Sequence, residues 1–190
     1  MEKPLNESQL NKIEKPKFLY HASSNRDIKE MEVRSESRRD DKEGDVVFAT
    51  PDLALAGAFL TGFSDSWANL GKINGVPYFV VGDKEKFIES DKGGAIYKLD
   101  SGSFNFDSQK GMSEDEWTSK ENVTPLGKTE VDSNLQFMLD NGLQVYFFDK
   151  EKFKEFKEIL KTGDTERMIE VLENETSENQ KLGKNIVEFR

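Results

Sequence analysis

The sequence contains no cysteine and only one histidine among its 190 residues. Without cysteine, disulfide scaffolds, cysteine-ligated zinc, iron–sulfur clusters and thiol nucleophiles are excluded. A single histidine likewise excludes a metal site built from several imidazoles. No run approaches the roughly 20 apolar residues of a membrane-spanning helix, and residues 1–18 contain no apolar segment typical of a secretion signal. We therefore expect a cytoplasmic protein with no metal and no membrane partner.

Positive charge is also scarce, because 27 lysine and arginine residues stand against 37 aspartate and glutamate residues. The resulting net charge of −10 repels the phosphate backbone of nucleic acids, so a nucleic-acid partner is not expected. Aromatic residues are plentiful, with 14 Phe, 4 Tyr and 2 Trp. This bulky apolar material distinguishes the chain from a disordered one, and its length suits one domain.

Short apolar segments are spread along the whole chain. The predicted strands cover residues 18–22, 45–49, 77–81, 95–99, 116–123 and 143–148. The predicted helices cover residues 53–60, 150–160 and 164–172, with one or two helical turns at 25–31. At the start of the first long helix, Thr50 is the expected N-cap and Pro51 the first helical residue. Because long helices do not alternate with the strands, the pattern indicates an α+β fold rather than a doubly wound parallel sheet.

One pentapeptide, Asp-Lys-Glu-Lys-Phe, occurs twice, at Asp83–Phe87 and at Asp149–Phe153. Each copy follows an apolar strand. We interpret the recurrence as a reused strand-to-helix exit, since nothing else in the chain repeats. In this interpretation the aspartate caps a helix and the phenylalanine holds that helix on the core.

The single histidine, His21, stands where the strand 18–22 ends and a turn containing Ser23 and Ser24 begins. An imidazole at a strand end, beside hydroxyl groups, is well placed to hydrogen-bond a ligand. The alternative is a partly buried histidine that only holds the turn in place. Residue type and position leave both interpretations open.

Three motifs follow one another between residues 18 and 60. Residues 19–24 are Leu-Tyr-His-Ala-Ser-Ser, residues 46–50 are Val-Val-Phe-Ala-Thr, and a helix of small residues follows. This order resembles the ADP-ribosyltransferase superfamily, and within it the histidine–tyrosine–glutamate branch of poly(ADP-ribose) polymerases and diphtheria-type toxins. The resemblance implies an ADP-ribosyltransferase-like α+β fold, with a split, curved β core and peripheral helices.

The resemblance also implies a division of the chain. An ADP-ribosyltransferase-like domain is expected over residues 17–162, between an N-terminal arm (1–16) and a C-terminal helix and polar tail (163–190). Strands 18–22 and 45–49 are expected to be neighbours, and their placement in separate sheets would argue against the family.

Four residues acquire roles from the resemblance. His21 matches the family histidine that bonds the adenosine-side or nicotinamide-side ribose hydroxyls of NAD. Ser23 matches the hydroxyl that helps to seat the nicotinamide amide, and Phe48 matches the phenylalanine of the family's Tyr-Phe-Ala motif. Glu116 matches the catalytic glutamate, whose carboxylate offsets the positive charge that develops on the ribose.

Other charged residues are candidates for the catalytic carboxylate and for a phosphate-binding group. Glu114 and Glu130 are the other candidates for the catalytic glutamate. An arginine of the charged loop 34–44, which contains Arg34, Arg38 and Arg39, is expected to hold phosphate, with Arg34 as the assigned residue, because a guanidinium matches the geometry of phosphate oxygens. A solvated loop that only balances its own acidic residues is the alternative for that arginine.

Two positions depart from the family pattern. Val47 stands where the family has a tyrosine that stacks on nicotinamide, and Ala22 stands where it has glycine. Tyr20, Tyr97 and Phe48 are candidates to supply the missing aromatic face. By strand alternation, Val47 and Ala49 share one face of their strand and Phe48 lies on the other.

The implied function is binding of NAD, or of an ADP-ribose-like nucleotide, with loss of nicotinamide and transfer to an unknown macromolecular acceptor or to water. NAD is then a substrate rather than a bound cofactor. The alternative is a catalytically inactive module of the same fold, for example one derived from a mobile element, that binds a ligand or partner. An RNA-end 2′-phosphate transferase is disfavoured by the acidic composition, and an interaction module using helix 150–160 stays open.

Overall fold

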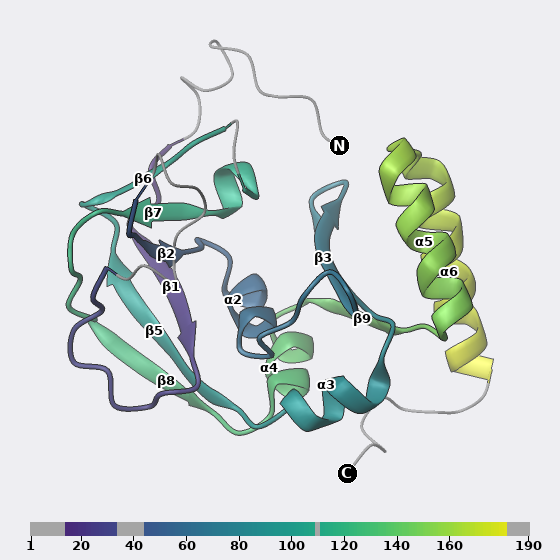
Figure 1. Cartoon of the computed structure of the whole chain (residues 1–190), viewed down its shortest axis with the longest axis horizontal. Helices are drawn as coiled ribbons and strands as arrows, with labels where there is room; N and C mark the ends of the chain where they lie inside the picture. Colours follow the sequence, from purple (N-terminus) through teal and green to yellow (C-terminus); the bar gives the residue numbers. More distant parts are fainter. Residues whose placement is uncertain (1–13, 34–43, 109–110, 182–190) are drawn as a thin grey trace.

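The computed structural model describes residues 14–33, 44–108 and 111–181. Within these residues the strands form three small three-stranded sheets, flanked by helices (Figure 1). The fold is therefore α+β, as predicted. Most of the expected arm 1–16 lies outside the described residues, and so does Arg34 with the loop that follows it.

The first sheet contains β1 (Phe18–Ser23), β5 (Gly94–Asp100) and β8 (Gly127–Val131) in the order β1–β5–β8. Both pairings are antiparallel, and His21 lies opposite Tyr97. β8 exposes four of its five residues, so it forms a polar edge of the sheet.

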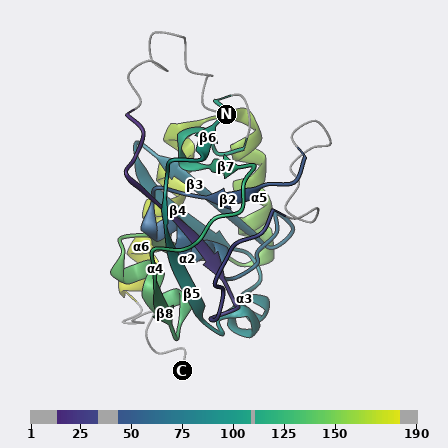
Figure 2. The same ribbon diagram turned by 90° about the vertical axis from the view of Figure 1, so that its left-hand side faces the viewer.

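The second sheet contains β2 (Val47–Ala49), β7 (Trp117–Ser119) and β6 (Phe104–Phe106) in the order β2–β7–β6, again antiparallel. In Figures 1 and 2 the strands of the first two sheets follow one another from β6 and β7 at one end, through β2 and β1, to β5 and β8 at the other.

One bridge joins these two sheets. The backbone N–H of Tyr20 donates to the carbonyl of Thr50 at 2.7 Å, and the N–H of Thr50 donates to the carbonyl of Tyr20 at 2.9 Å. The expectation that β1 and β2 are neighbours is met at this single pair. Apart from this bridge the two strands belong to separate sheets, which is the outcome stated above to argue against the family. We call this place, where Tyr20 meets Thr50, the junction.

The helix that follows β2 is α2 (Leu53–Phe59), and its N-cap is Asp52. Oδ1 of Asp52 accepts from the backbone N–H groups of Ala54 and Leu55 at 2.9 and 3.3 Å. The expected cap at Thr50, with Pro51 as the first helical residue, is therefore wrong by two residues. The carbonyl of Thr50 accepts from Tyr20 across the junction, and the first helical hydrogen bond runs from the N–H of Ala56 to the carbonyl of Asp52.

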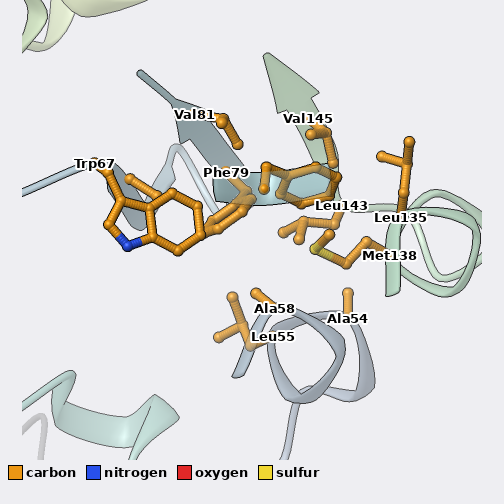
Figure 3. Close-up of a cluster of buried hydrophobic side chains, with 12 residues drawn as sticks. Ala54, Leu55, Ala58, Trp67, Phe79, Val81, Leu135, Met138, Leu143 and Val145 are labelled. Atoms are coloured by element: carbon orange, nitrogen blue, oxygen red, sulfur yellow. The ribbon is translucent and has the colours of Figure 1, made fainter. Parts of the chain in front are cut away.

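The third sheet contains β3 (Ala68–Ile73), β4 (Val76–Val81) and β9 (Gln144–Phe147) in the order β3–β4–β9. β3 and β4 form a hairpin, whereas β4 and β9 are parallel. Residues of α2, β4 and β9 share a buried cluster, in which Leu55 and Ala58 point towards Phe79 (Figure 3). Helix α2 thus packs between the third sheet and the first.

The repeated pentapeptide has the predicted role. Asp83 caps α3 (Lys84–Ser90) and Asp149 caps α5 (Lys150–Thr162), each by accepting from the backbone N–H three residues later. The two phenylalanines pack in different clusters: Phe87 lies with residues of α2 and β9, and Phe153 with residues of α5 and α6 (Thr165–Lys181).

Several segments differ from the prediction. No helix forms over residues 25–31, residues 104–106 form a strand, and the last helix continues to Lys181 instead of ending near residue 172. Besides the strand at 104–106, which is β6, three more strands or helices were not predicted: β3, β8 and α4 (Asn134–Asp140). None of the helices in the described ranges is long and apolar enough to cross a membrane. The cytoplasmic location stays a prediction.

Candidate functional site

His21 lies on β1 beside the junction and is half-buried. Its Nδ1 atom is 2.7 Å from the backbone carbonyl oxygen of Phe48 on β2. A carbonyl oxygen only accepts, so Nδ1 is the protonated nitrogen, and in the neutral ring Nε2 carries the lone pair. The imidazole therefore spans the split between the first two sheets in a defined tautomer.

Phe48 and Val47 lie on opposite faces of β2. Val47 is 3 % exposed and packs in a cluster with Trp117 and Tyr97, so it is a core residue. Phe48 is half-buried and pairs with Thr118 of β7 on the other face. If an aromatic ring from this strand contacts a ligand, the ring is that of Phe48, one residue after the position at which the family has its tyrosine.

Glu116 immediately precedes β7 and is half-buried. Its carboxylate lies against the backbone of Gly111, where a Cβ atom would collide with both carboxylate oxygens. Strand alternation places Glu116 on the face of β7 that carries Thr118, away from the buried Trp117. Continuing the β2–β7 register by one pair puts Glu116 opposite Thr50, at the junction.

His21 and Glu116 therefore reach the same junction from different sides. His21 shares a face of β1 with Leu19, and Leu19 packs in the same cluster as Trp117. Glu116 lies on the face of β7 opposite to Trp117. The fold brings the two backbones together, but it does not place the two side chains on one surface.

Ser23 and Tyr97 are already engaged with the turn after β1. The hydroxyl of Ser23 accepts from the N–H of Asn25 at 3.2 Å. The hydroxyl of Tyr97 donates to the carbonyl of Asn25 at 2.7 Å and accepts from the N–H of Ile28 at 3.1 Å. Tyr97 is only 1 % exposed, so its ring presents no face to a ligand, and its assignment to cofactor binding does not fit the structure.

The two alternative glutamates are placed differently. Glu114 is exposed, and its carbonyl accepts from the indole N–H of Trp117 at 2.8 Å. Glu130 lies on β8, beyond β5 from the junction, where its carboxylate is 2.9 Å from Nζ of Lys128. The hydrogen bond from Lys128 lowers the pKa of Glu130. Of the three candidates, Glu116 is the one that lies at the junction.

A further charged group adjoins the junction and was not predicted from the sequence. Nζ of Lys72, on β3, is 2.5 Å from Oδ1 of Asp115 and 3.1 Å from Oδ2 of Asp52. All three side chains are at least three-quarters buried. The Asn74-Gly75 pair, a strong hairpin signal, marks the turn after this strand and is the sequence signal for β3. Nothing in the sequence points to the pairing itself.

Comparison of the chain with family models, with curated proteins and with solved structures found no match.

Proposed function

We propose that the protein binds NAD, or an ADP-ribose-like nucleotide, at the junction between its first two sheets, and that it transfers ADP-ribose to an acceptor. The observation that carries this proposal is the orientation of His21. Its Nδ1–H donates to the Phe48 carbonyl, which fixes the ring at the junction and makes Nε2 the nitrogen assigned to a ribose hydroxyl in the complex.

Glu116 supplies the second half of the proposal. In the reaction, the bond between the ribose carbon and nicotinamide breaks, and its electron pair leaves with nicotinamide. An acceptor oxygen or nitrogen then bonds to that carbon and releases its proton to solvent. The carboxylate of Glu116 stabilises the positive charge that develops on the ribose.

The opposite faces of His21 and Glu116 constrain how the nucleotide lies. Glu116 must approach the nicotinamide-side ribose, where the bond breaks. His21 is therefore assigned to the adenosine-side ribose. Phe48, half-buried on the Glu116 face, is the aromatic residue for the nicotinamide ring.

A second candidate function is nucleotide binding without catalysis. Two observations favour it. Position 47, where the family has its stacking tyrosine, is a buried valine, and the side chains of His21 and Glu116 lie on different faces. In this second candidate function the protein holds the nucleotide without breaking its bond to nicotinamide, and no acceptor takes part.

Titration calorimetry with NAD and with ADP-ribose, combined with an assay for released nicotinamide, tests both functions. Glu116→Gln should bind NAD as the wild type does but release nicotinamide about a hundredfold more slowly. Glu130→Gln, a carboxylate change of the same size away from the junction, is the matched control. Saturable binding with no release of nicotinamide supports the second candidate. Absence of binding of both nucleotides by the wild type contradicts both.

A further inference from the structure

Lys72 links three elements that are far apart in the sequence. It comes from β3 of the third sheet, whereas Asp52 begins α2 and Asp115 precedes β7. The side chains of the lysine and the two aspartates are 24, 23 and 16 % exposed, so water screens these pairs less than pairs on the open surface. The ammonium group of Lys72 pairs with both carboxylates.

The two aspartates are themselves fixed. Asp52 uses one carboxylate oxygen to cap α2 and the other to bind Lys72. Asp115 is adjacent in sequence to Glu116, and its N–H donates to the carbonyl of Met112 at 3.2 Å, which closes the short turn before β7. A contact that holds the Asp115 side chain therefore also restrains the adjoining backbone of Glu116.

Glu116 is held from both sides in the sequence. On one side is Asp115, bound to Lys72. On the other side is Trp117, which is 3 % exposed and donates its indole N–H to the carbonyl of Glu114. The tryptophan anchors this segment to the core, and the lysine anchors it to the start of α2 and to the third sheet.

We infer that Lys72 is a positioning residue for Glu116: through Asp115 it fixes the segment 111–119 against the N-terminus of α2, and so sets the place of the Glu116 carboxylate. The catalytic part of this inference rests on the proposed function. Under this inference the third sheet contributes to the site, although none of the motifs that suggested the function lies in that sheet.

Charge adds to the effect of geometry. Without the ammonium group, the carboxylates of Asp52 and Asp115 face each other in a partly buried place and repel. The carboxylate of Glu116 follows directly in the chain. Loss of Lys72 is thus expected to move the segment away from α2, and a methionine of similar length cannot prevent that movement.

Hydrogen exchange of the whole chain, measured by mass spectrometry, tests the structural part. Lys72→Met should raise exchange in segment 111–119 about tenfold and leave β5 and α5 unchanged. Lys72→Arg restores the charge and can bond both aspartates, so exchange should return to within about threefold of the wild type. Lys128→Met removes a lysine that pairs with Glu130 on the exposed β8 edge, and it is the matched control.

A second variant covers the case in which Lys72→Met does not fold. Asp52→Ser retains an N-cap for α2 but removes one partner of Lys72. It should raise exchange in segment 111–119 by a smaller factor, about threefold. Two results overturn the inference. One is unchanged exchange in segment 111–119 in both Lys72→Met and Asp52→Ser. The other is a rise in exchange that is equal along the whole chain and that Lys72→Arg does not reverse.

The catalytic part is tested with NAD. Lys72→Met should lower kcat for nicotinamide release by about ten- to a hundredfold, while the Kd for NAD from calorimetry stays within about twofold, because the lysine does not touch the nucleotide. A wild-type protein that neither binds nor cleaves NAD contradicts the proposed function alone. The inference that Lys72 fixes the segment is then decided by the exchange result.

Discussion

The Nδ1 atom of His21 lies 2.7 Å from the backbone carbonyl of Phe48, 27 residues further along the chain. This hydrogen bond and the Tyr20–Thr50 bridge both join β1 to β2, although the two strands belong to separate sheets. His21 is thus both a structural tie and a candidate ligand group, and a pair of substitutions separates the two roles.

His21→Ala should leave the protein folded, with a loss of about 0.5–1.5 kcal/mol in the free energy of unfolding, and should weaken nucleotide binding. His21→Asn retains an N–H donor close to the position of Nδ1 but has no counterpart of Nε2. It should recover most of the stability and none of the affinity. Urea unfolding and titration calorimetry measure the two effects. Full affinity for NAD in the asparagine variant would show that His21 is only structural.

The family has its stacking tyrosine at the position of Val47, but Val47 is buried, so a tyrosine introduced there would enter the core rather than present a stacking face. Val47→Tyr now adds a large ring to a packed cluster and should cost about 1–3 kcal/mol of stability. Phe48→Ala should instead weaken nucleotide binding, since Phe48 lies on the other face. Thermal unfolding and calorimetry of both variants check this. A Val47→Tyr protein that is stable and binds more tightly would support the original alignment of the motif.

The sequence was most informative where a strand or helix is marked by a dense apolar run or a clear cap. β1, β4, β5 and β9 have such runs, and the two Asp-Lys-Glu-Lys-Phe segments cap helices as predicted. β8 was missed because four of its five residues are exposed, so it has no apolar pattern. β3 was missed because asparagine and glycine interrupt its alternation.

The candidate site was less predictable than the fold. His21 was selected as the single histidine and Glu116 through the resemblance to the family, and the fold brings the backbones of both to the junction. The partner of His21 is a backbone carbonyl, which no residue type reveals. The pairing of Lys72 with Asp115 spans 43 residues, in a chain with 27 basic and 37 acidic side chains, so charge alone selects no partner.

The two helix caps offer a direct test of the repeated pentapeptide. Asp83→Ala and Asp149→Ala should each lower the free energy of unfolding by about 1 kcal/mol, because each leaves a helix N–H without its acceptor. Asp→Ser at either position should restore most of it. Chemical denaturation of the four variants measures the effect. Equal stability of the alanine and serine variants would mean that the side-chain bonds contribute nothing.

Gly93, at the start of β5, cannot be replaced by a residue with a side chain. Its φ of +68° is in the left-handed region, and a Cβ atom would collide with the carbonyl oxygen of Val131, a backbone atom. Gly93→Ala should therefore cost about 3 kcal/mol or more, the sum of the conformational cost and the clash. Gly127→Ala, with no atom within 4 Å of its Cβ position, should change stability by less than about 0.5 kcal/mol.

The Lys72 cluster predicts a specific pH dependence of stability. Burial alone would lower the pKa of Lys72, but the hydrogen bonds and charges of Asp115 and Asp52 outweigh it, so the pKa lies above its ordinary value of 10.5. A lysine whose pKa is raised by folding stabilises the native state fully below its pKa in the unfolded chain. That contribution is lost as the pH rises above 10.5, through the higher pKa of the folded state.

The wild type and Lys72→Met should therefore differ in free energy of unfolding by a constant amount between about pH 7 and pH 9, and the difference should shrink at about pH 11 and above. Taking the difference between the two proteins at each pH removes the titration of the other lysines and tyrosines, which is common to both. Urea denaturation at each pH gives the required values. Lys128→Met, whose lysine is exposed, should show a smaller difference from the wild type throughout, because solvent screens its pairing with Glu130. A Lys72→Met difference that already falls between about pH 7 and pH 9 would mean that the ammonium group is not held by the two aspartates in the folded protein.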